Sequence, residues 1–269
     1  MTSTTPTKLH GQAAHSDARI RTYWRAKADE DAASHAAGSL RPHFSEHPVW
    51  LGIMPMLLAP SPLGRPIRRV ADMGSGNGVV AEKLARLGYQ VIAIERAETR
   101  IELMRRRLAQ FPGVEVRQGD AMSPPLEIGE VDAIVSRNLV WMLPDPAGAL
   151  AEWSRLVGPG GRVAALDATR RLERNWLISM AWRLHGIAPV WKWKVDRERP
   201  VTLLNPAPFA NLPGTGPVAA AWREAGLREV VAHDLSWVST VRAYGRPGLS
   251  NLLHRSRYYA VLGDVGAEA

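Results

Sequence analysis

Three closely spaced glycines between two apolar runs constrain the fold of this chain more than any other sequence feature. Residues 70–95 read VADMGSGNGVVAEKLARLGYQVIAIE. The apolar run before Gly74 predicts a strand, and the spacing of apolar residues after Gly78 predicts a helix. Residues 91–94 predict a second strand that is buried on both faces. This strand–turn–helix–strand unit is typical of a doubly wound α/β sheet, in which ligands bind at the carboxyl ends of the strands.

The spacing of the glycines argues against a dinucleotide cofactor. The dinucleotide fingerprint G-x-G-x-x-G would place its third glycine at Val79, whereas the chain has it one residue earlier, at Gly78. With Asp72 just ahead of it, the turn resembles motif I of class I S-adenosylmethionine-dependent methyltransferases, and in particular their small-molecule, methyltransferase type 11-like members. Glu95 ends the second strand, where that family keeps an acid that accepts hydrogen bonds from both ribose hydroxyls.

The segments after Glu95 continue the resemblance. A helix is predicted over residues 99–110 and a strand over 114–118, followed by Asp120, where the family commonly contacts the adenine. A fourth strand is predicted over residues 131–136. The resemblance implies that S-adenosylmethionine is the cofactor and that the following residues hold it: Tyr23, Asp72, Gly74, Ser75, Gly76, Gly78, Glu95, Arg96, Asp120, Ala121, Arg137 and Asn138.

The resemblance also implies the architecture of the whole domain. We expect a mostly parallel seven-stranded sheet of order 3-2-1-4-5-7-6, with helices on both faces. Later strands are predicted over residues 162–166, 228–234 and 257–262. The expected organisation is a disordered N-terminus (1–16), a helical N-terminal cover (17–66) and a methyltransferase domain (67–269) with a helical lid inserted at 170–214.

The methyl acceptor is expected to lie beyond the fourth strand. The sequence SRNLVWMLPDP lacks the Asn/Asp-Pro-Pro-aromatic box of DNA and some protein amino-methyltransferases, and it resembles small-molecule enzymes instead. Trp141 is read either as a wall of the active site or as a core residue. Trp176 and Trp191, in the lid, can stack on a flat acceptor, pack the lid onto the sheet, or stack on nucleic-acid bases. We interpret all three tryptophans as substrate-binding residues.

Two histidines are the candidate catalytic bases. His43 and His47 are four residues apart and could take a proton from the acceptor, or they could be surface or helix-capping residues. Pro48 and the lack of a third ligand argue against a metal site. Asp167, at the end of the fifth predicted strand, would have only Asn138 as a partner for a hard divalent ion. No metal is therefore expected.

Composition sets limits on partners and location. The chain has 269 residues, no cysteine and a net charge of +8, and it has no apolar run of the roughly 20 residues that span a bilayer. A cytoplasmic protein without membrane contact is expected, and a homodimer is compatible with the sequence. The basic run at residues 105–107 is interpreted as the solvated side of a helix, so nucleic-acid binding is not expected.

The expected function is methyl transfer to an O or N atom of a small molecule, in secondary metabolism. Three alternatives stay open at this point: an RNA methyltransferase, an enzyme that attacks a different carbon of the sulfonium, and a cofactor-binding scaffold without catalysis.

Overall fold

The fold is known from a computed structural model, which describes residues 47–169, 215–238 and 257–266, together with Thr22, Arg25, Ala26, Asp29 and Ala33. The expected lid (170–214), the expected disordered segment (1–16) and most of the expected N-terminal cover lie outside the described residues. Four expected site residues lie outside them as well: Tyr23, His43, Trp176 and Trp191.

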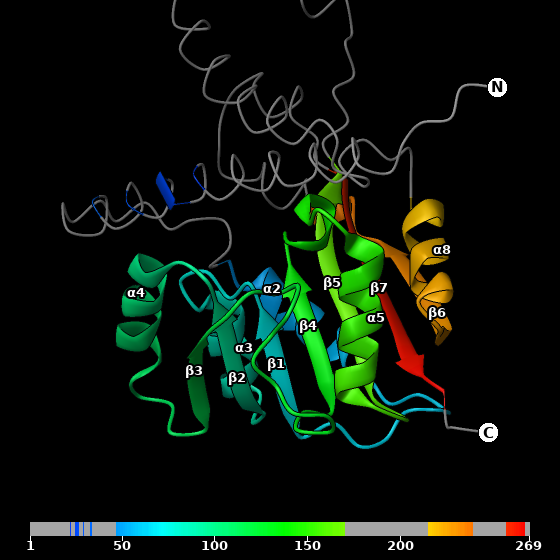
Figure 1. Ribbon diagram of the computed structural model, residues 1–269, viewed down its shortest axis with the longest axis horizontal. Coiled ribbons are helices and arrows are strands. Elements are labelled where there is room, and N and C mark those ends of the chain that lie inside the picture. Colours follow the sequence, from blue (N-terminus) through cyan, green and yellow to red (C-terminus); the bar gives the residue numbers. More distant parts are fainter. Residues whose placement is uncertain are drawn as a thin grey trace, which may run out of the picture.

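One sheet forms the centre of the described structure (Figure 1). Its seven strands are β1 (Arg69–Met73), β2 (Gln90–Glu95), β3 (Val114–Gln118), β4 (Ala133–Arg137), β5 (Arg162–Thr169), β6 (Leu227–Asp234) and β7 (Arg257–Val265). Their order is β3-β2-β1-β4-β5-β7-β6. Neighbours among β1 to β5 are parallel, whereas β7 is antiparallel to both β5 and β6. The predicted fold and strand order are confirmed.

The register of the central strands brings their carboxyl ends to one edge of the sheet. Met73, the last residue of β1, pairs with Ile94 of β2 and with Ser136 of β4. We call this side, where β1 to β5 end, the carboxyl edge. Nearly every residue of β1, β2 and β4 is buried, as expected for strands covered by helices on both faces.

Helices cover both faces of the sheet (Figure 1). On one face, α2 (Val49–Leu57), α3 (Val79–Arg86) and α4 (Glu98–Leu108) contribute to one apolar core. On the other, α5 (Pro146–Val157) and α8 (Gly216–Glu224) contribute to a second core. Within the described ranges, no helix is both long and apolar enough to cross a bilayer.

The fourth strand begins at Ala133, two residues later than the apolar run at Val131 predicts. Asp132 precedes it, and its carboxylate accepts hydrogen bonds from the amides of Arg68 and Arg69, at 2.9 Å each. These side-chain contacts hold the amino end of β1 against the start of β4. A 3-10 turn, η2 (Val140–Met142), follows β4 at the carboxyl edge.

A buried ion pair joins β5, β7 and the segment before β1. Arg162 donates from Nε to Asp264 Oδ1 at 2.7 Å and from Nη2 to Asp264 Oδ2 at 3.0 Å, and both residues are buried. Ser61 Oγ also donates to Asp264, and Arg162 Nη1 donates to the carbonyl of Ala59. Because every charge in the cluster has a partner, the link that leads into β1 is held against the sheet.

Candidate functional site

The turn after β1 requires glycine for its backbone conformation. Gly74, Gly76 and Gly78 have φ values of 65°, 59° and 81°, which L side chains rarely adopt. At Gly78 a Cβ would also lie 2.9 Å from Met104 Cγ, so the glycine lets α3 and α4 approach each other. Ser75 Oγ donates to the carbonyl of Asp72 at 2.7 Å and stabilises the turn from within.

Glu95 connects the end of β2 to this turn. Its Oε2 accepts the amide of Gly76 at 2.8 Å, while Oε1 accepts the amides of Arg96 and Ala97 at 2.9 Å each. Glu95 is only 9% exposed. A carboxylate offers about four lone-pair directions. Three are occupied here, so Oε2 keeps one direction for a hydroxyl of a ligand.

Asp72 lies beneath the turn, on the face of the sheet that α3 covers. Its Oδ2 accepts the amide of Ala81 at 3.1 Å, and the residue is 1% exposed. Burial raises the pKa of Asp72 to about 7, and hydrogen bonding by Ser75, the charge of Arg137 and the Ala81 amide act in the opposite direction. The carboxyl is therefore poised between its two protonation states near neutral pH.

Asp120 and Ala121 lie after β3 and are fixed from two sides. Asp120 Oδ2 accepts from Arg96 Nη1 at 2.8 Å, and its Oδ1 accepts the amide of Met122 at 3.0 Å. The side chains of Arg96 and Asp120 remain 39% and 41% exposed. Trp153 of α5 donates from its indole nitrogen to the carbonyl of Ala121 at 2.7 Å. The expected adenine-contacting segment is therefore ordered and still accessible.

Arg137, the last residue of β4, stacks on a tryptophan that we did not assign from the sequence. Its guanidinium carbon lies 5.3 Å from the ring centroid of Trp50, which is buried in α2. Trp50 in turn makes an edge contact with Tyr258, with ring centroids 5.4 Å apart. Burial lowers the pKa of Arg137, and the charge of Asp72 opposes that shift. Asn138 follows, exposed and with a φ of 55°.

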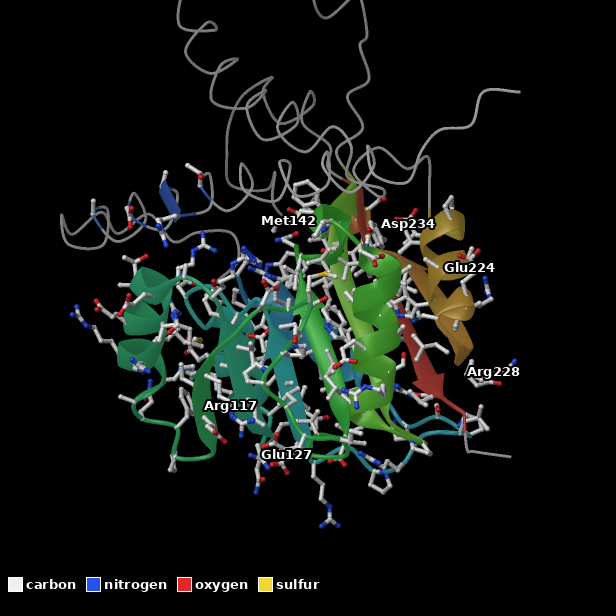
Figure 2. All side chains as sticks on the ribbon, in the orientation of Figure 1. Arg117, Glu127, Met142, Glu224, Arg228 and Asp234 are labelled. Atoms are coloured by element: carbon white, nitrogen blue, oxygen red, sulfur yellow. The ribbon has the colours of Figure 1, made fainter. Side chains whose placement is uncertain are left out.

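These contacts show which expected residues the structure brings together. Gly76 with Glu95, Arg96 with Asp120, and Asp72 with Ser75 are linked directly at the carboxyl edge. The expected substrate residue Trp141 is half-buried in η2, on the same edge. Met142 of that turn and Glu127 mark the two opposite ends of the sheet in Figure 2.

His47 is the member of the histidine pair that the structure describes, and it lies two residues before the start of α2. It is exposed, and its Nδ1 accepts the amide of Val49 at 3.1 Å. This bond occupies Nδ1 of the side chain. The catalytic role of His47 stays a prediction.

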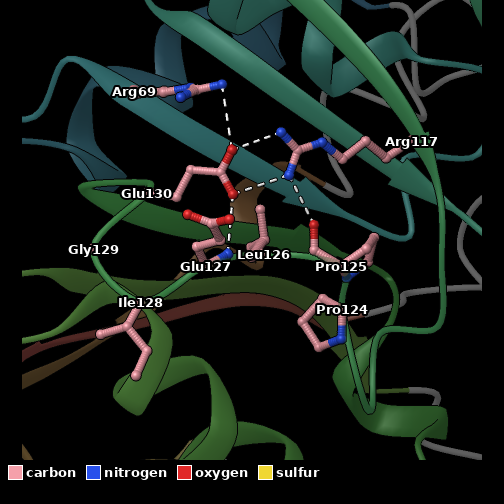
Figure 3. A pocket seen from close by; sticks show the side chains of 9 residues that line it. All are labelled: Arg69, Arg117, Pro124, Pro125, Leu126, Glu127, Ile128, Gly129 and Glu130. Carbon is pink, nitrogen blue, oxygen red and sulfur yellow. Dashed lines mark hydrogen bonds and ion pairs between the residues drawn. The ribbon is translucent and has the colours of Figure 1, made fainter.

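A hollow at the opposite end of the sheet has a different character (Figure 3). Arg117 donates to Glu130 at 2.6 Å, and Arg69 lies 3.6 Å from the same carboxylate. The hydrogen bonds from Arg117 lower the pKa of Glu130 to about 2. Because these charges neutralise one another, we assign no ligand to this hollow. Among the described residues, no group of three or more His, Asp or Glu side chains is arranged to hold a metal ion.

Comparison with known proteins identifies the domain. Residues 71–165 match a family model described as a methyltransferase domain. The part of the chain from β1 to β5 is therefore similar to a methyltransferase domain. The methyltransferase family that the glycine turn and Glu95 indicated is thereby confirmed.

Curated relatives match parts of the chain. The chain is 37% identical over 168 residues to an uncharacterized 37.1 kDa protein in transposon TN4556 of Streptomyces fradiae, a match that covers 60% of this chain and 48% of that protein. It is 33% identical over 127 residues to a ubiquinone biosynthesis O-methyltransferase of Methylocella silvestris, which covers 46% of this chain and 47% of that protein. The chain thus spans about half the length of the curated relatives that it matches.

Two solved structures share the fold at low sequence identity. Haemonchus contortus phosphoethanolamine N-methyltransferase 2, in complex with S-adenosyl-L-methionine, superposes with a TM-score of 0.57 at 13% identity, covering 81% of this chain and 52% of that one. Geranyl diphosphate C-methyltransferase from Streptomyces coelicolor A3(2) gives a TM-score of 0.55 at 15% identity, covering 80% and 77%. At these identities the likeness shows the fold alone.

Proposed function

We propose that this chain binds S-adenosylmethionine at the carboxyl edge and transfers its methyl group to an O or N atom of a small molecule. The observation that carries the proposal is the direct link between Glu95 and the glycine turn at Gly76. It supports a site in which an acid at the end of β2 and bare backbone after β1 face the same ligand, as in the methyltransferase family.

The residues at the carboxyl edge fit an adenosine-bearing cofactor. Glu95 has lone-pair capacity for a ribose hydroxyl, and Gly76 presents a face without a side chain. Asp120 is accessible and has carboxylate oxygens that can accept from an exocyclic amine. Asp72, in its ionised form, places a buried negative charge near the turn, which favours a cationic group nearby. These roles are proposals that rest on the placement of the side chains.

When bound, S-adenosylmethionine supplies an electrophilic methyl group on a positively charged sulfur, and its leaving group is a neutral thioether. The part left to the chain is to align the acceptor and exclude water. Trp141 and the turn after Arg137 are the described groups placed to face an acceptor. We propose that the N-terminal cover and the lid, with Trp176 and Trp191, complete the enclosure.

Calorimetry on the full chain tests the proposal. Wild-type protein is expected to bind S-adenosylmethionine and S-adenosylhomocysteine but not NAD. Glu95→Ala removes charge-assisted hydrogen bonds worth about 1.5–3 kcal/mol each, so affinity should fall at least tenfold per bond lost. The matched control is Glu102→Ala, an exposed acid on α4, which should bind as wild type does. Unchanged affinity in Glu95→Ala would rule out the ribose assignment.

The RNA alternative predicts a role for the exposed arginines of α4. Arg105 and Arg106 are exposed, whereas Arg107 pairs with Glu82 at 2.9 Å. If the acceptor is a small molecule, the double variant Arg105→Gln/Arg106→Gln should keep its cofactor affinity and show no loss of tRNA binding. Binding to tRNA that weakens steeply with salt, and weakens further in this variant, would favour the RNA alternative.

Product analysis separates the remaining alternatives. Methyl transfer releases S-adenosylhomocysteine, whereas attack at the aminocarboxypropyl carbon bonded to the sulfur releases methylthioadenosine. A scaffold without catalysis would bind the cofactor and release neither product with any acceptor tested.

A further inference from the structure

A buried aspartate holds the turn that follows β4. Asp167 of β5 lies one residue beyond the partner of Arg137 in the β4–β5 register. Its Oδ1 accepts the amide of Leu139 at 2.9 Å, and its Oδ2 accepts the amide of Trp141 at 3.2 Å. The residue is 1% exposed. Each carboxylate oxygen therefore fixes one amide of residues 138–141, which we call the β4 exit turn.

The surroundings of Asp167 make these amides its main partners. Tyr259 of β7 is paired with Asp167 across the β5–β7 register, yet its buried hydroxyl has no hydrogen-bond partner among the described residues. Burial, and then the charge of Asp167, raise the pKa of Tyr259. Burial likewise raises the pKa of Asp167 to about 7, and backbone amides of the β4 exit turn oppose that shift. The carboxyl is thus stabilised by the turn that it holds.

The β4 exit turn also supports the glycine turn. A Cβ at Gly74 would lie 3.1 Å from both terminal methyl carbons of Leu139, so these two segments are packed tightly. Asn138 adopts a φ of 55°, a conformation that Asn tolerates better than most residues but that still requires support. A continuous series of contacts runs from Asp167 through the Leu139 amide and side chain to Gly74.

We propose that Asp167 is a positioning residue, which fixes the β4 exit turn and, through Leu139, the glycine turn at Gly74. The structural role of Asp167 does not depend on the proposed function, but its effect on catalysis rests on that function. The turn carries Asn138 and Trp141 at the carboxyl edge, so its conformation sets where an acceptor meets the cofactor. Asp167 itself need not touch either ligand.

Asp167→Asn tests the proposal, because an amide of the same size keeps one acceptor oxygen and loses the other. Hydrogen exchange of the full chain, followed by mass spectrometry, should show exchange that is about tenfold faster and confined to residues 138–141, the effect of one lost buried hydrogen bond. Affinity for S-adenosylhomocysteine should fall several-fold. The matched control is Asp234→Asn, since Asp234 also ends a strand and accepts a backbone amide, that of Ser236 at 2.8 Å.

Each outcome decides the inference. Exchange that is unchanged in the turn would overturn it, and so would faster exchange spread evenly over β1, β2 and β4, since Asp167 would then only support the core. Tyr259→Phe removes the hydroxyl without a partner and should leave the turn protected. If Tyr259→Phe and Asp167→Asn reduced the protection of the turn equally, the effect would instead be assigned to the Tyr259 hydroxyl.

The inference and the proposed function can fail separately. The exchange comparison uses protein without ligand and remains decisive even if wild-type chain binds no S-adenosylhomocysteine. In that case the proposed function is wrong, whereas the role of Asp167 in the fold stands on the exchange data.

Discussion

Glu95 Oε2 accepts the amide proton of Gly76 at 2.8 Å, which makes the acid at the end of β2 and the turn after β1 one hydrogen-bonded unit. A ribose hydroxyl that donates to the same oxygen must share it with this amide. We predict that binding of S-adenosylhomocysteine shifts the amide resonance of Gly76 more than those of Arg96 and Ala97, whose protons bind Oε1. Equal shifts at all three amides would place the ligand elsewhere on the carboxylate.

The glycine turn offers a test that separates backbone strain from crowding. Gly78 and Gly88 both have positive φ, at 81° and 91°, but a Cβ meets Met104 Cγ at 2.9 Å in the first case and nothing within 4 Å in the second. We expect Gly88→Ala to lower the free energy of unfolding by about 1–2 kcal/mol through strain alone. Gly78→Ala should lower the free energy of unfolding by about 1–3 kcal/mol more than Gly88→Ala does, because α4 must move away from the new methyl group. Equal losses in urea unfolding would contradict the packing role of Gly78.

The buried pair of Arg162 and Asp264 should be far more sensitive than an exposed one. Asp264→Ala leaves a buried guanidinium without its counter-charge, and we expect a loss of about 3–5 kcal/mol in the free energy of unfolding. The comparison is Glu152→Ala, which removes the partner of Arg155 at 2.7 Å on the surface of α5. No measurable change is expected there. Similar unfolding midpoints for both variants would show that the buried pair contributes little.

Stability without ligand should fall as pH rises toward neutrality. Burial raises the pKa of Asp72 and of Asp167 from 3.8 to about 7. The folded state therefore holds protons that the unfolded state has released between these values. Their stabilising effect is complete below about pH 4 and is lost as pH passes through about 7. Among the described residues, the charged or titratable groups acting on these carboxyls are Arg137 and Glu95 for Asp72, and Tyr259 for Asp167.

Urea unfolding across this pH range measures the effect. Wild-type stability should decline with pH, and replacing both aspartates by Asn should flatten the profile. A cationic cofactor favours ionised Asp72, so affinity for S-adenosylmethionine should rise over the same range. A wild-type profile that rises with pH would mean that these carboxyls are ionised well below neutrality.

Local patterns in the sequence predicted the sheet and the cofactor side of the site. Glu95 ends a strand, and the glycine turn and Asp120 come within two residues of a strand end, so their position at the carboxyl edge depends on short-range order. Contacts between distant segments could not be predicted in the same way. The stack of Trp50 on Arg137 requires α2 to lie near the end of β4. The hydrophobic periodicity of either segment does not indicate this contact. The bonds from Asp167 to the β4 exit turn likewise depend on the pairing of β4 with β5.

The position of β7 between β5 and β6 has a consequence for synthesis of the chain. β6 leaves the ribosome before β7, yet in the described sheet its pairing partner is β7. Until β7 has been synthesised, residues 227–234 have no strand to pair with, and the outer side of β5 also lacks β7 as its neighbour. Two strand edges are exposed in that interval, and such edges promote pairing between chains. A nascent chain stalled there is thus more prone to aggregation than one in which β7 has already inserted.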